Sequence, residues 1–383
     1  MRIAFDCSLV PGQQGGVGQY SYQLAHALSR IDKENSYILY LLTPMYREIA
    51  EEKLGLPDGG NFSMLMKRTP VPFQLLRYAG AREYMLGSVK ADVFHSNNFC
   101  VPRFRDRRKK VIVTIYDISV ATHPECHKKA NIAHCLAGIR DAVKYADAII
   151  SISEHTKDDL IKHFGAPPEK ITVTRLAAGP GFRNIMDTSV LQRVRARYGL
   201  PAKFVLFIGS LEPRKNIKGL LRAYSCLPEK MQKEFPMVIA GGRGWLNSDI
   251  PGLVSELGIK DRVHFAGFIN DEDLSAVYSM ASLFVYPSLY EGFGLPILEA
   301  MACGTPVVTS KTSSMPEVAG DAAALIDPSD ADELAFSMRQ LLESDAKRAE
   351  LVIKGFERAK MFSWEKCARE TLAVYRRVAG LNA

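Results

Sequence analysis

Two glutamates separated by seven residues stand in the part of the sequence with the clearest chemical pattern. Glu291 follows a short apolar run that is typical of a strand, and Glu299 falls within the helical stretch that comes next. Gly292 and Gly294 allow backbone amides to approach a ligand closely. Because free amides at a helix N-terminus attract anions, this strand–loop–helix segment predicts an anion-binding site that carries two carboxylates.

A pair of adjacent cations follows another apolar run, Phe204–Ile208. Arg214 and Lys215 lie in the loop after this run, just before a helical stretch. Arginine binds phosphate oxygens through its planar fork, whereas lysine acts as a point charge. The pair is therefore suited to neutralise a departing diphosphate. The alternative is a loop at a helix start with solvated charges.

The string from Tyr286 to Pro306 resembles the E-x7-E motif of the retaining glycosyltransferases of family 4, which have the GT-B fold. The resemblance extends over nearly the whole chain. It implies that Glu291 contacts hydroxyls of the donor sugar and that Glu299 accepts hydrogen bonds from the ribose of the nucleotide. Arg214 and Lys215 match the family's phosphate-binding loop and take its role. No metal or other cofactor is expected, since basic residues would replace the metal.

The same resemblance places further residues at the donor. They are Gly16, Gly18, Gly209, Gly292, Phe293, Gly294, Leu295 and Phe268. The amides of residues 292–295 would line the sugar and phosphate site, and the glycines of the 15–18 loop would lie against the phosphates. That loop alone is a weak signal, because it does not give the G-x-G-x-x-G spacing. Phe268 would pack against the base, with ordinary loop packing as the alternative.

The first domain departs from the family at one position. After the strand-like run Val111–Ile115 the family usually places His-Asp, and its histidine contacts the transferred sugar; here Tyr116 and Asp117 stand there. Asp117 is retained as a catalytic candidate. A phenol with a pKa near ~10 does not share a proton at neutral pH. His123 or His95 could substitute, or each could be an ordinary packed or surface histidine.

Short apolar runs alternate with helical patterns along the 383 residues, which predicts an α/β protein with two doubly wound, Rossmann-like parallel sheets. The N-terminal acceptor-side domain is expected over 1–183 and the nucleotide-sugar-binding domain over 184–362. Residues 363–383 are expected to form a helix that packs back on the first domain. The GT-B fold implied by the resemblance would place the site in a central cleft.

Seven scattered cysteines without a C-x-x-C pair indicate reduced thiols in a cytoplasm. The sequence contains no signal segment and no apolar stretch of the ~18 residues that a membrane span needs. His123, Cys126, His127, His134 and Cys135 are close in sequence, but their spacing fits no ordinary zinc motif. We therefore predict a cytoplasmic protein without a metal site.

The net charge of +7 is concentrated in the first half of the chain. Residues 60–145 hold 15 basic and six acidic residues, with the densest run at 103–110. A one-sided basic surface attracts anionic lipid, a phosphorylated acceptor or nucleic acid. We expect it to face the inner surface of the cell membrane, with no nucleic acid as partner. A solvated surface that maintains solubility is the alternative.

The stretch 117–125 resembles mannosyltransferases of O-antigen assembly. The resemblance implies mannose transfer from GDP-mannose to a lipid-linked saccharide, with retention of anomeric configuration. Three alternatives stay open at this stage. They are a nucleotide-sugar epimerase of similar two-domain fold, a nicotinamide oxidoreductase and a non-catalytic nucleotide-sugar-binding protein.

Overall fold

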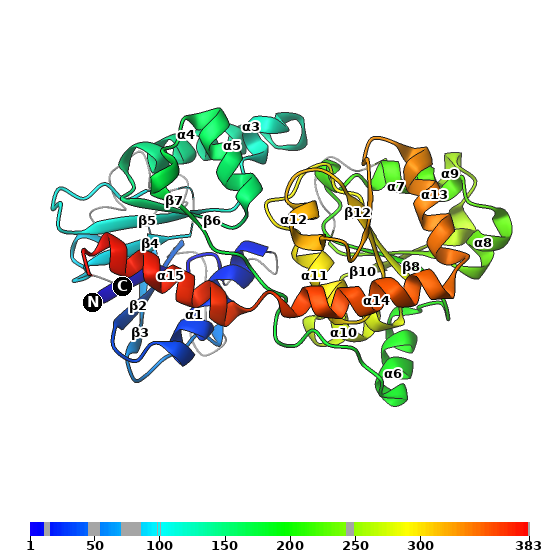
Figure 1. Cartoon of the computed structure of the whole chain (residues 1–383), viewed down its shortest axis with the longest axis horizontal. Helices are drawn as coiled ribbons and strands as arrows, with labels where there is room; N and C mark the ends of the chain where they lie inside the picture. The colour runs from blue at the N-terminus through cyan, green and yellow to red at the C-terminus, as the bar shows by residue number, and fades with distance from the viewer. Residues whose placement is uncertain are drawn as a thin grey trace. The chain divides into compact units, whose positions relative to one another are not determined.

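A computed structural model of the chain describes residues 1–10, 16–44, 54–69, 86–97, 99, 101–242 and 249–381 (Figure 1). The chain forms two compact units, residues 1–176 with 363–383, and residues 177–362. Residues 177–183, which we expected at the end of the first domain, belong to the second unit. Its contacts explain this, because the Ser275 hydroxyl donates to the Gly181 carbonyl and the Phe182 ring packs edge-on against Tyr278.

Within its described residues, the first unit contains a seven-stranded parallel sheet of order β3-β2-β1-β4-β5-β6-β7. The strands are β1 (Arg2–Asp6), β2 (Ser36–Pro44), β3 (Phe62–Thr69), β4 (Val93–Ser96), β5 (Lys110–Ile115), β6 (Ala148–Ser151) and β7 (Ile171–Val173). The helices are α1 (Gly16–Ile31), α3 (Ser119–Thr122), α4 (Lys129–Tyr145), α5 (Glu154–Phe164) and α15 (Trp364–Val378). Apolar strands β1, β4, β5 and β6 form the centre, as expected for a sheet covered on both faces.

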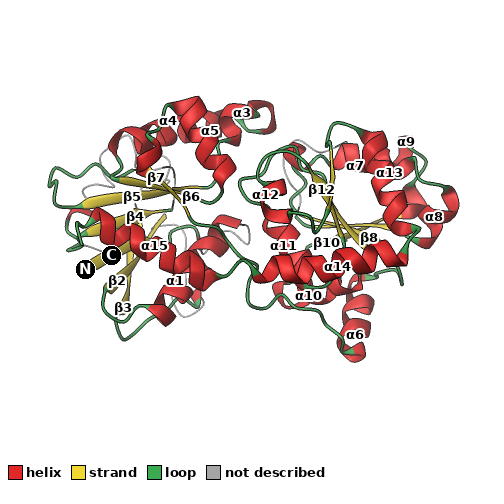
Figure 2. Ribbon diagram, in the orientation of Figure 1, coloured by secondary structure: helices red, strands yellow, loops and turns green. Residues whose placement is uncertain are grey.

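Helices cover both faces of this sheet. Figure 2 shows α4 and α5 on one face and α1 with α15 on the other. The core beneath α4 and α5 joins Ile139 and Leu160 to strand residues such as Val113 and Ile149. The last helix begins at Ser363, whose hydroxyl accepts a hydrogen bond from the Lys366 amide. Residues 363–381 thus form part of the first unit, where α15 packs against α1.

The second unit contains a six-stranded parallel sheet of order β10-β9-β8-β11-β12-β13 in its described part. The strands are β8 (Val205–Ile208), β9 (Met237–Ala240), β10 (Val263–Gly267), β11 (Leu283–Tyr286), β12 (Val307–Ser310) and β13 (Ala324–Ile326). The longer helices are α6 (Thr188–Tyr198), α7 (Ile217–Ser225), α10 (Asp271–Met280), α11 (Leu295–Ala302), α13 (Ala331–Leu342) and α14 (Asp345–Lys360). Three shorter ones are α8 (Glu229–Glu234), α9 (Ile250–Glu256) and α12 (Met315–Ala319).

Both sheets are doubly wound, so the predicted fold class is confirmed. In the second unit α7, α9 and α13 lie on one face of the sheet and α10, α11 and α14 on the other (Figure 2). The strand order reverses between β1 and β4 in the first sheet and between β8 and β11 in the second. Ligands of such sheets bind at the carboxyl ends of the strands, where the order reverses. The loops after β8 and β11 are therefore expected to carry a ligand site.

Candidate functional site

The loop after β8 ends in a single 3-10 turn, Pro213–Lys215, directly before α7. Asn216 closes this turn in the left-handed conformation, with φ of 56°, which asparagine tolerates better than most residues. Its side-chain amide donates a 2.6 Å hydrogen bond to the Pro328 carbonyl, which fixes the turn. Arg214 and Lys215 are thereby held on a rigid corner instead of a free loop.

Glu291 lies against both of these cations. Its Oε2 is 2.7 Å from Nη1 of Arg214, and its Oε1 is 2.6 Å from Nζ of Lys215. The three side chains are only 9–13% exposed. Burial alone would raise the pKa of Glu291, but the charges of Arg214 and Lys215 outweigh it and lower that pKa to about 2. The carboxylate is therefore ionised at any working pH.

Tyr286, the last residue of β11, completes this cluster, and sequence reasoning did not single it out. Its hydroxyl donates a 3.0 Å hydrogen bond to Oε1 of Glu291 and accepts one from Nζ of Lys215. Burial and the nearby Glu291 charge raise the pKa of Tyr286, so the phenol keeps its proton. The signal available in the sequence was its place at a strand end, five residues before Glu291.

The segment from Glu291 to α11 is anchored by the loop after β12, because β11 and β12 are adjacent strands. Ser313 accepts a 3.0 Å hydrogen bond from the Glu291 amide, and Ser314 donates to the carbonyls of Glu291 and Phe293. Gly294 precedes the helix with φ of 104°, a conformation that side-chain-bearing residues rarely adopt. Of the residues predicted here, Gly292, Phe293 and Gly294 are buried, whereas Leu295 is partly exposed.

Glu299 lies in the second turn of α11, eight residues after Glu291 in the same strand–loop–helix segment. Its Oε2 accepts a 3.1 Å hydrogen bond from the Tyr278 hydroxyl. Burial raises the pKa of Glu299 to about 7, although the Tyr278 hydrogen bond and the Lys215 charge act in the opposite direction. The two glutamates therefore differ: Glu291 is permanently charged, and Glu299 titrates near neutrality.

Two glycine-containing turns meet at the ends of β8 and β9. The Gly209 amide donates a 3.0 Å hydrogen bond to the Ala240 carbonyl. A Cβ atom on Gly241 would lie 2.0 Å from the Gly209 carbonyl oxygen, so residue 241 must be glycine. Phe268, which follows β10, is 47% exposed. The structure brings Gly209, Arg214, Lys215, Glu291 and Glu299 to one edge of the sheet.

The remaining predicted residues belong to the first unit. Gly16 is the first residue of α1, and Gly18 is buried in the first turn of this helix, which follows β1 in the chain. Gly15 lies outside the described residues. Asp117 accepts hydrogen bonds from the amide and hydroxyl of Ser119, at 2.8 and 2.6 Å, and so fixes the start of α3. Nothing in these contacts reveals a catalytic role for Asp117.

The histidines proposed as substitutes for Tyr116 differ in exposure. His95 is fully buried, with its Nδ1 2.7 Å from the Tyr375 hydroxyl and its Nε2 2.7 Å from Thr114 Oγ1. Burial lowers the pKa of His95 to about 3, so it is a neutral core residue that cannot reach a substrate. His123 is partly exposed, and its Nδ1 lies 3.0 Å from Thr122 Oγ1. Tyr116 itself is 8% exposed.

No group of three or more histidine, cysteine or acidic side chains in the described ranges is arranged to hold a metal ion. None of the helices in the part of the chain that the structure describes combines the length and apolar character needed to cross a membrane.

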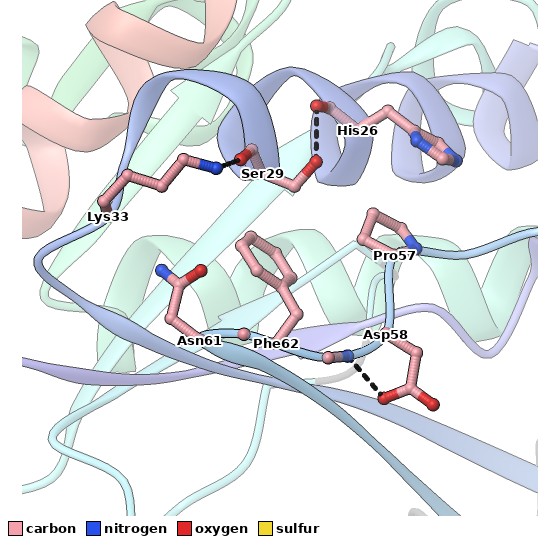
Figure 3. A pocket seen from close by; sticks show the side chains of 9 residues that line it. His26, Ser29, Lys33, Pro57, Asp58, Asn61 and Phe62 are labelled. Carbon is pink, nitrogen blue, oxygen red and sulfur yellow. Dashed lines mark hydrogen bonds between the residues drawn. The ribbon is translucent and has the colours of Figure 1, made fainter.

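A surface pocket of about 630 Å³ lies in the first unit, between the end of α1 and the start of β3 (Figure 3). Lys33 donates to the Ser29 carbonyl there, and the Ser29 hydroxyl donates to the His26 carbonyl. The pocket lies at the amino end of β3, and none of the predicted site residues lines it.

Comparison with known proteins gives two family matches that together span most of the chain. Residues 14–175 match the family described as Glycosyltransferase Family 4, and residues 193–358 match Glycosyl transferases group 1. The solved structure of sucrose-phosphate synthase from Thermosynechococcus elongatus has the same fold as this chain. The two superpose with a TM-score of 0.80 at 23% sequence identity, and the match covers 99% of each chain.

Two of the similar curated proteins from Escherichia coli are mannosyltransferases by name. O-antigen chain mannosyltransferase B is 33% identical over 388 residues, which cover 98% of this chain and all of the relative. The serotype-specific mannosyltransferase WbdA is 35% identical over 237 residues, covering 61% of this chain and 29% of the relative. The chain therefore belongs to the group 1 glycosyltransferases of family 4 and is a glycosyltransferase of the GT-B fold.

Proposed function

We propose that the chain transfers mannose from GDP-mannose to a saccharide acceptor carried on a lipid, in the synthesis of a surface polysaccharide such as O-antigen. The names of both Escherichia coli relatives support a mannosyl donor, and the name of the first supports an O-antigen product. The first of them aligns over 98% of this chain and its own full length, so both units of this chain have a counterpart in that relative.

The observation that carries the proposal is the cluster at the β8–β11 strand ends. Arg214 and Lys215 provide positive charge for a diphosphate at a place where the strand order reverses. Glu291, held between them, provides hydrogen-bond acceptors for sugar hydroxyls, and Glu299 does so for the ribose. Phe268, with its exposed ring, provides a surface for the base.

In the proposed reaction the bond between the anomeric carbon and the β-phosphate oxygen breaks, and a bond from that carbon to an acceptor hydroxyl oxygen forms. The acceptor's proton passes to the departing phosphate, and GDP leaves. Arg214 and Lys215 stabilise the negative charge that develops on the leaving group. Because the Glu291 carboxylate accepts a hydrogen bond from the fixed Tyr286 hydroxyl, it is suited to orient the sugar rather than attack it. We therefore favour same-face attack by the acceptor, which retains configuration.

The transfer is proposed to need no metal ion, since the two cations supply the charge that a metal would. Activity of the purified enzyme should survive an excess of EDTA and be unchanged by added Mg²⁺ or Mn²⁺. A loss of activity in EDTA that either ion restores would disprove this part.

The donor is tested with a panel of nucleotide sugars and a synthetic lipid-diphosphate saccharide acceptor. We expect GDP-mannose to give the highest kcat/KM, and NMR of the product to give an α-linked mannose. A matched variant, Glu291→Ala, should release no GDP while keeping the melting temperature within a few degrees. A preference of about tenfold for another sugar nucleotide would refute the donor assignment.

Association with an anionic membrane is proposed through part of the basic segment 60–145. Three of its cations are paired: Arg103 with Asp141, Arg108 with Asp106 and Lys110 with Asp147. Arg105 and Arg107 are exposed and form no ion pair with a described residue. Within the run 103–110, these two are the arginines that remain to contact lipid phosphates.

Co-sedimentation with phosphatidylglycerol vesicles tests this surface. The double variant Arg105→Glu with Arg107→Glu should bind these vesicles more weakly than the wild type, and wild-type binding should fall at high salt. The matched reversal of Lys230 and Lys260, exposed in the second unit, should bind as the wild type does. Equal binding by both double variants would show that the run 103–110 is not the lipid-binding surface.

A further inference from the structure

The cations expected to meet a diphosphate are already neutralised by carboxylates. Arg214 lies between Glu291, at 2.7 Å, and Glu212, at 3.6 Å, while Lys215 contacts Glu291 at 2.6 Å. Two positive and two negative groups thus form a cluster whose formal charge is zero. A diphosphate gains little from such a cluster unless one carboxylate gives up its cations.

Because the cluster is buried, Glu291 and a bound diphosphate would compete strongly for Arg214 and Lys215. The side chains of Glu212, Arg214 and Lys215 are 10%, 13% and 11% exposed, so water screens their charges weakly. A buried cation holds its partner firmly, and charge-assisted hydrogen bonds are about twice as strong as neutral ones. The oxygens of Glu291 and those of a diphosphate therefore compete for the same two cations.

We infer that the donor's diphosphate displaces Glu291 from Arg214 and Lys215, and that the Tyr286 hydroxyl then keeps the released carboxylate in place to receive the sugar. This inference rests on the proposed donor site. It makes Tyr286 a positioning residue and makes the sugar-binding acid available only once the diphosphate is bound.

Tyr286 is suited to this task by its place in the fold. It is 1% exposed, and its ring is stacked with Phe284 and Phe207 at centroid distances of 5.7 and 6.2 Å. The phenol therefore stays fixed on β11 while Glu291 turns. Its hydroxyl donates to Glu291 and accepts from Lys215. The bond to Glu291 does not depend on the cation, so it survives when a phosphate takes Lys215.

Titration calorimetry with inorganic pyrophosphate tests the competition on the full chain, because this probe needs neither a base nor a sugar. Glu291→Gln removes the carboxylate charge that both cations share. Pyrophosphate should then bind about tenfold more tightly than to the wild type, the scale of one charge-assisted contact. Glu256→Gln is the matched control, since Glu256 is an exposed carboxylate of the second unit that forms no ion pair with a described residue. Its affinity should equal that of the wild type.

The outcomes separate the inference from the proposed function. Unchanged or weaker binding by Glu291→Gln overturns the competition, whereas Arg214→Ala with wild-type affinity overturns the phosphate site itself. Tyr286→Phe, which loses only an oxygen, gives a second measurement should Glu291→Gln fail to fold. It should bind pyrophosphate within about threefold of the wild type yet lower kcat at least about tenfold with little change in donor KM. Wild-type kcat in this variant would refute the positioning role.

Discussion

The Tyr278 hydroxyl donates a 3.1 Å hydrogen bond to Oε2 of Glu299, the only hydrogen bond to this side chain among the described residues. Burial raises the pKa of Glu299 to about 7 in spite of this bond. A ribose hydroxyl donates to a carboxylate but gains less from the protonated acid. Nucleotide affinity should therefore rise as pH increases through about 7, measured as the Kd for GDP between pH 5.5 and 8.5.

Two variants give this pH dependence its controls. Glu299→Gln cannot ionise, so its GDP affinity should be weaker and flat across the range. Tyr278→Phe removes a hydrogen bond that lowers the pKa of Glu299, so the midpoint should move to higher pH. A midpoint near pH 4.5 in the wild type, or one unaffected in Tyr278→Phe, would show that Glu299 does not bind the nucleotide.

Lys215 is expected to contribute to the chemical step. Its Nζ lies 4.7 Å from the centre of the Tyr286 ring and donates to the Tyr286 hydroxyl, so its position is fixed before the leaving group departs. Removing one such preorganised charge typically costs about 10²–10³ in kcat. Lys215→Ala should show a loss of this size in single-turnover transfer. Lys218→Ala is the control, because Lys218 is exposed and paired with Asp249; a loss in both variants would indicate a general effect on folding.

Much of the fold was predictable because buried parallel strands appear as apolar runs. The runs Phe204–Ile208 and Val111–Ile115 were predicted, and β8 and β5 match them to within one residue. β3 was not, since Lys67 and Arg68 interrupt its apolar residues, and β13 has only three residues. The first domain was predicted to end at residue 183, whereas the first unit ends at residue 176. The contacts of Gly181 and Phe182 with α10 are tertiary, so no pattern in the local sequence indicates them.

The site was predictable in its charged residues but not in their partners. Glu291, Arg214 and Lys215 could be named from strand-end loops, yet their mutual ion pairs depend on β8 and β11 being neighbours. Sheet order is a tertiary property that a sequence pattern does not specify. For the same reason Ser313 and Ser314, which follow β12, could not be linked to the Glu291 loop in advance. The roles of the predicted residues in binding and catalysis stay predictions.

The turns after β8 and β9 approach each other so closely at Gly241 that adding one methyl group there should strongly reduce the stability of the fold. Alanine there would place its Cβ 2.0 Å from the Gly209 carbonyl oxygen, at a φ of 136°. Moving the Gly209 turn would also shift the Arg214 corner. Gly241→Ala should lower the free energy of unfolding by about 2–4 kcal/mol, from strain and the lost turn contact. Gly242→Ala, with open space around its Cβ, should change it by less than about 1 kcal/mol; equal effects in urea unfolding would contradict this.

The buried His95 predicts how the protein responds to acid. The imidazole is neutral in the folded state because burial lowers its pKa from 6.5 to about 3. The unfolded chain takes up a proton at about pH 6.5, so between pH 6.5 and 3 the unfolded state binds more protons than the folded state. The free energy of unfolding should therefore be fully retained above about pH 6.5 and should fall as the pH is lowered toward 3.

His95→Gln removes this titration while keeping polar atoms near Tyr375 and Thr114. Its free energy of unfolding at pH 7 should be lower than that of the wild type, by about 1–3 kcal/mol for a disturbed buried hydrogen bond. The difference between the two proteins should narrow as the pH falls, because only the wild type loses stability by protonation of this residue. A difference that is constant from pH 7 to 4.5 in urea titrations would mean that His95 is protonated equally in both states.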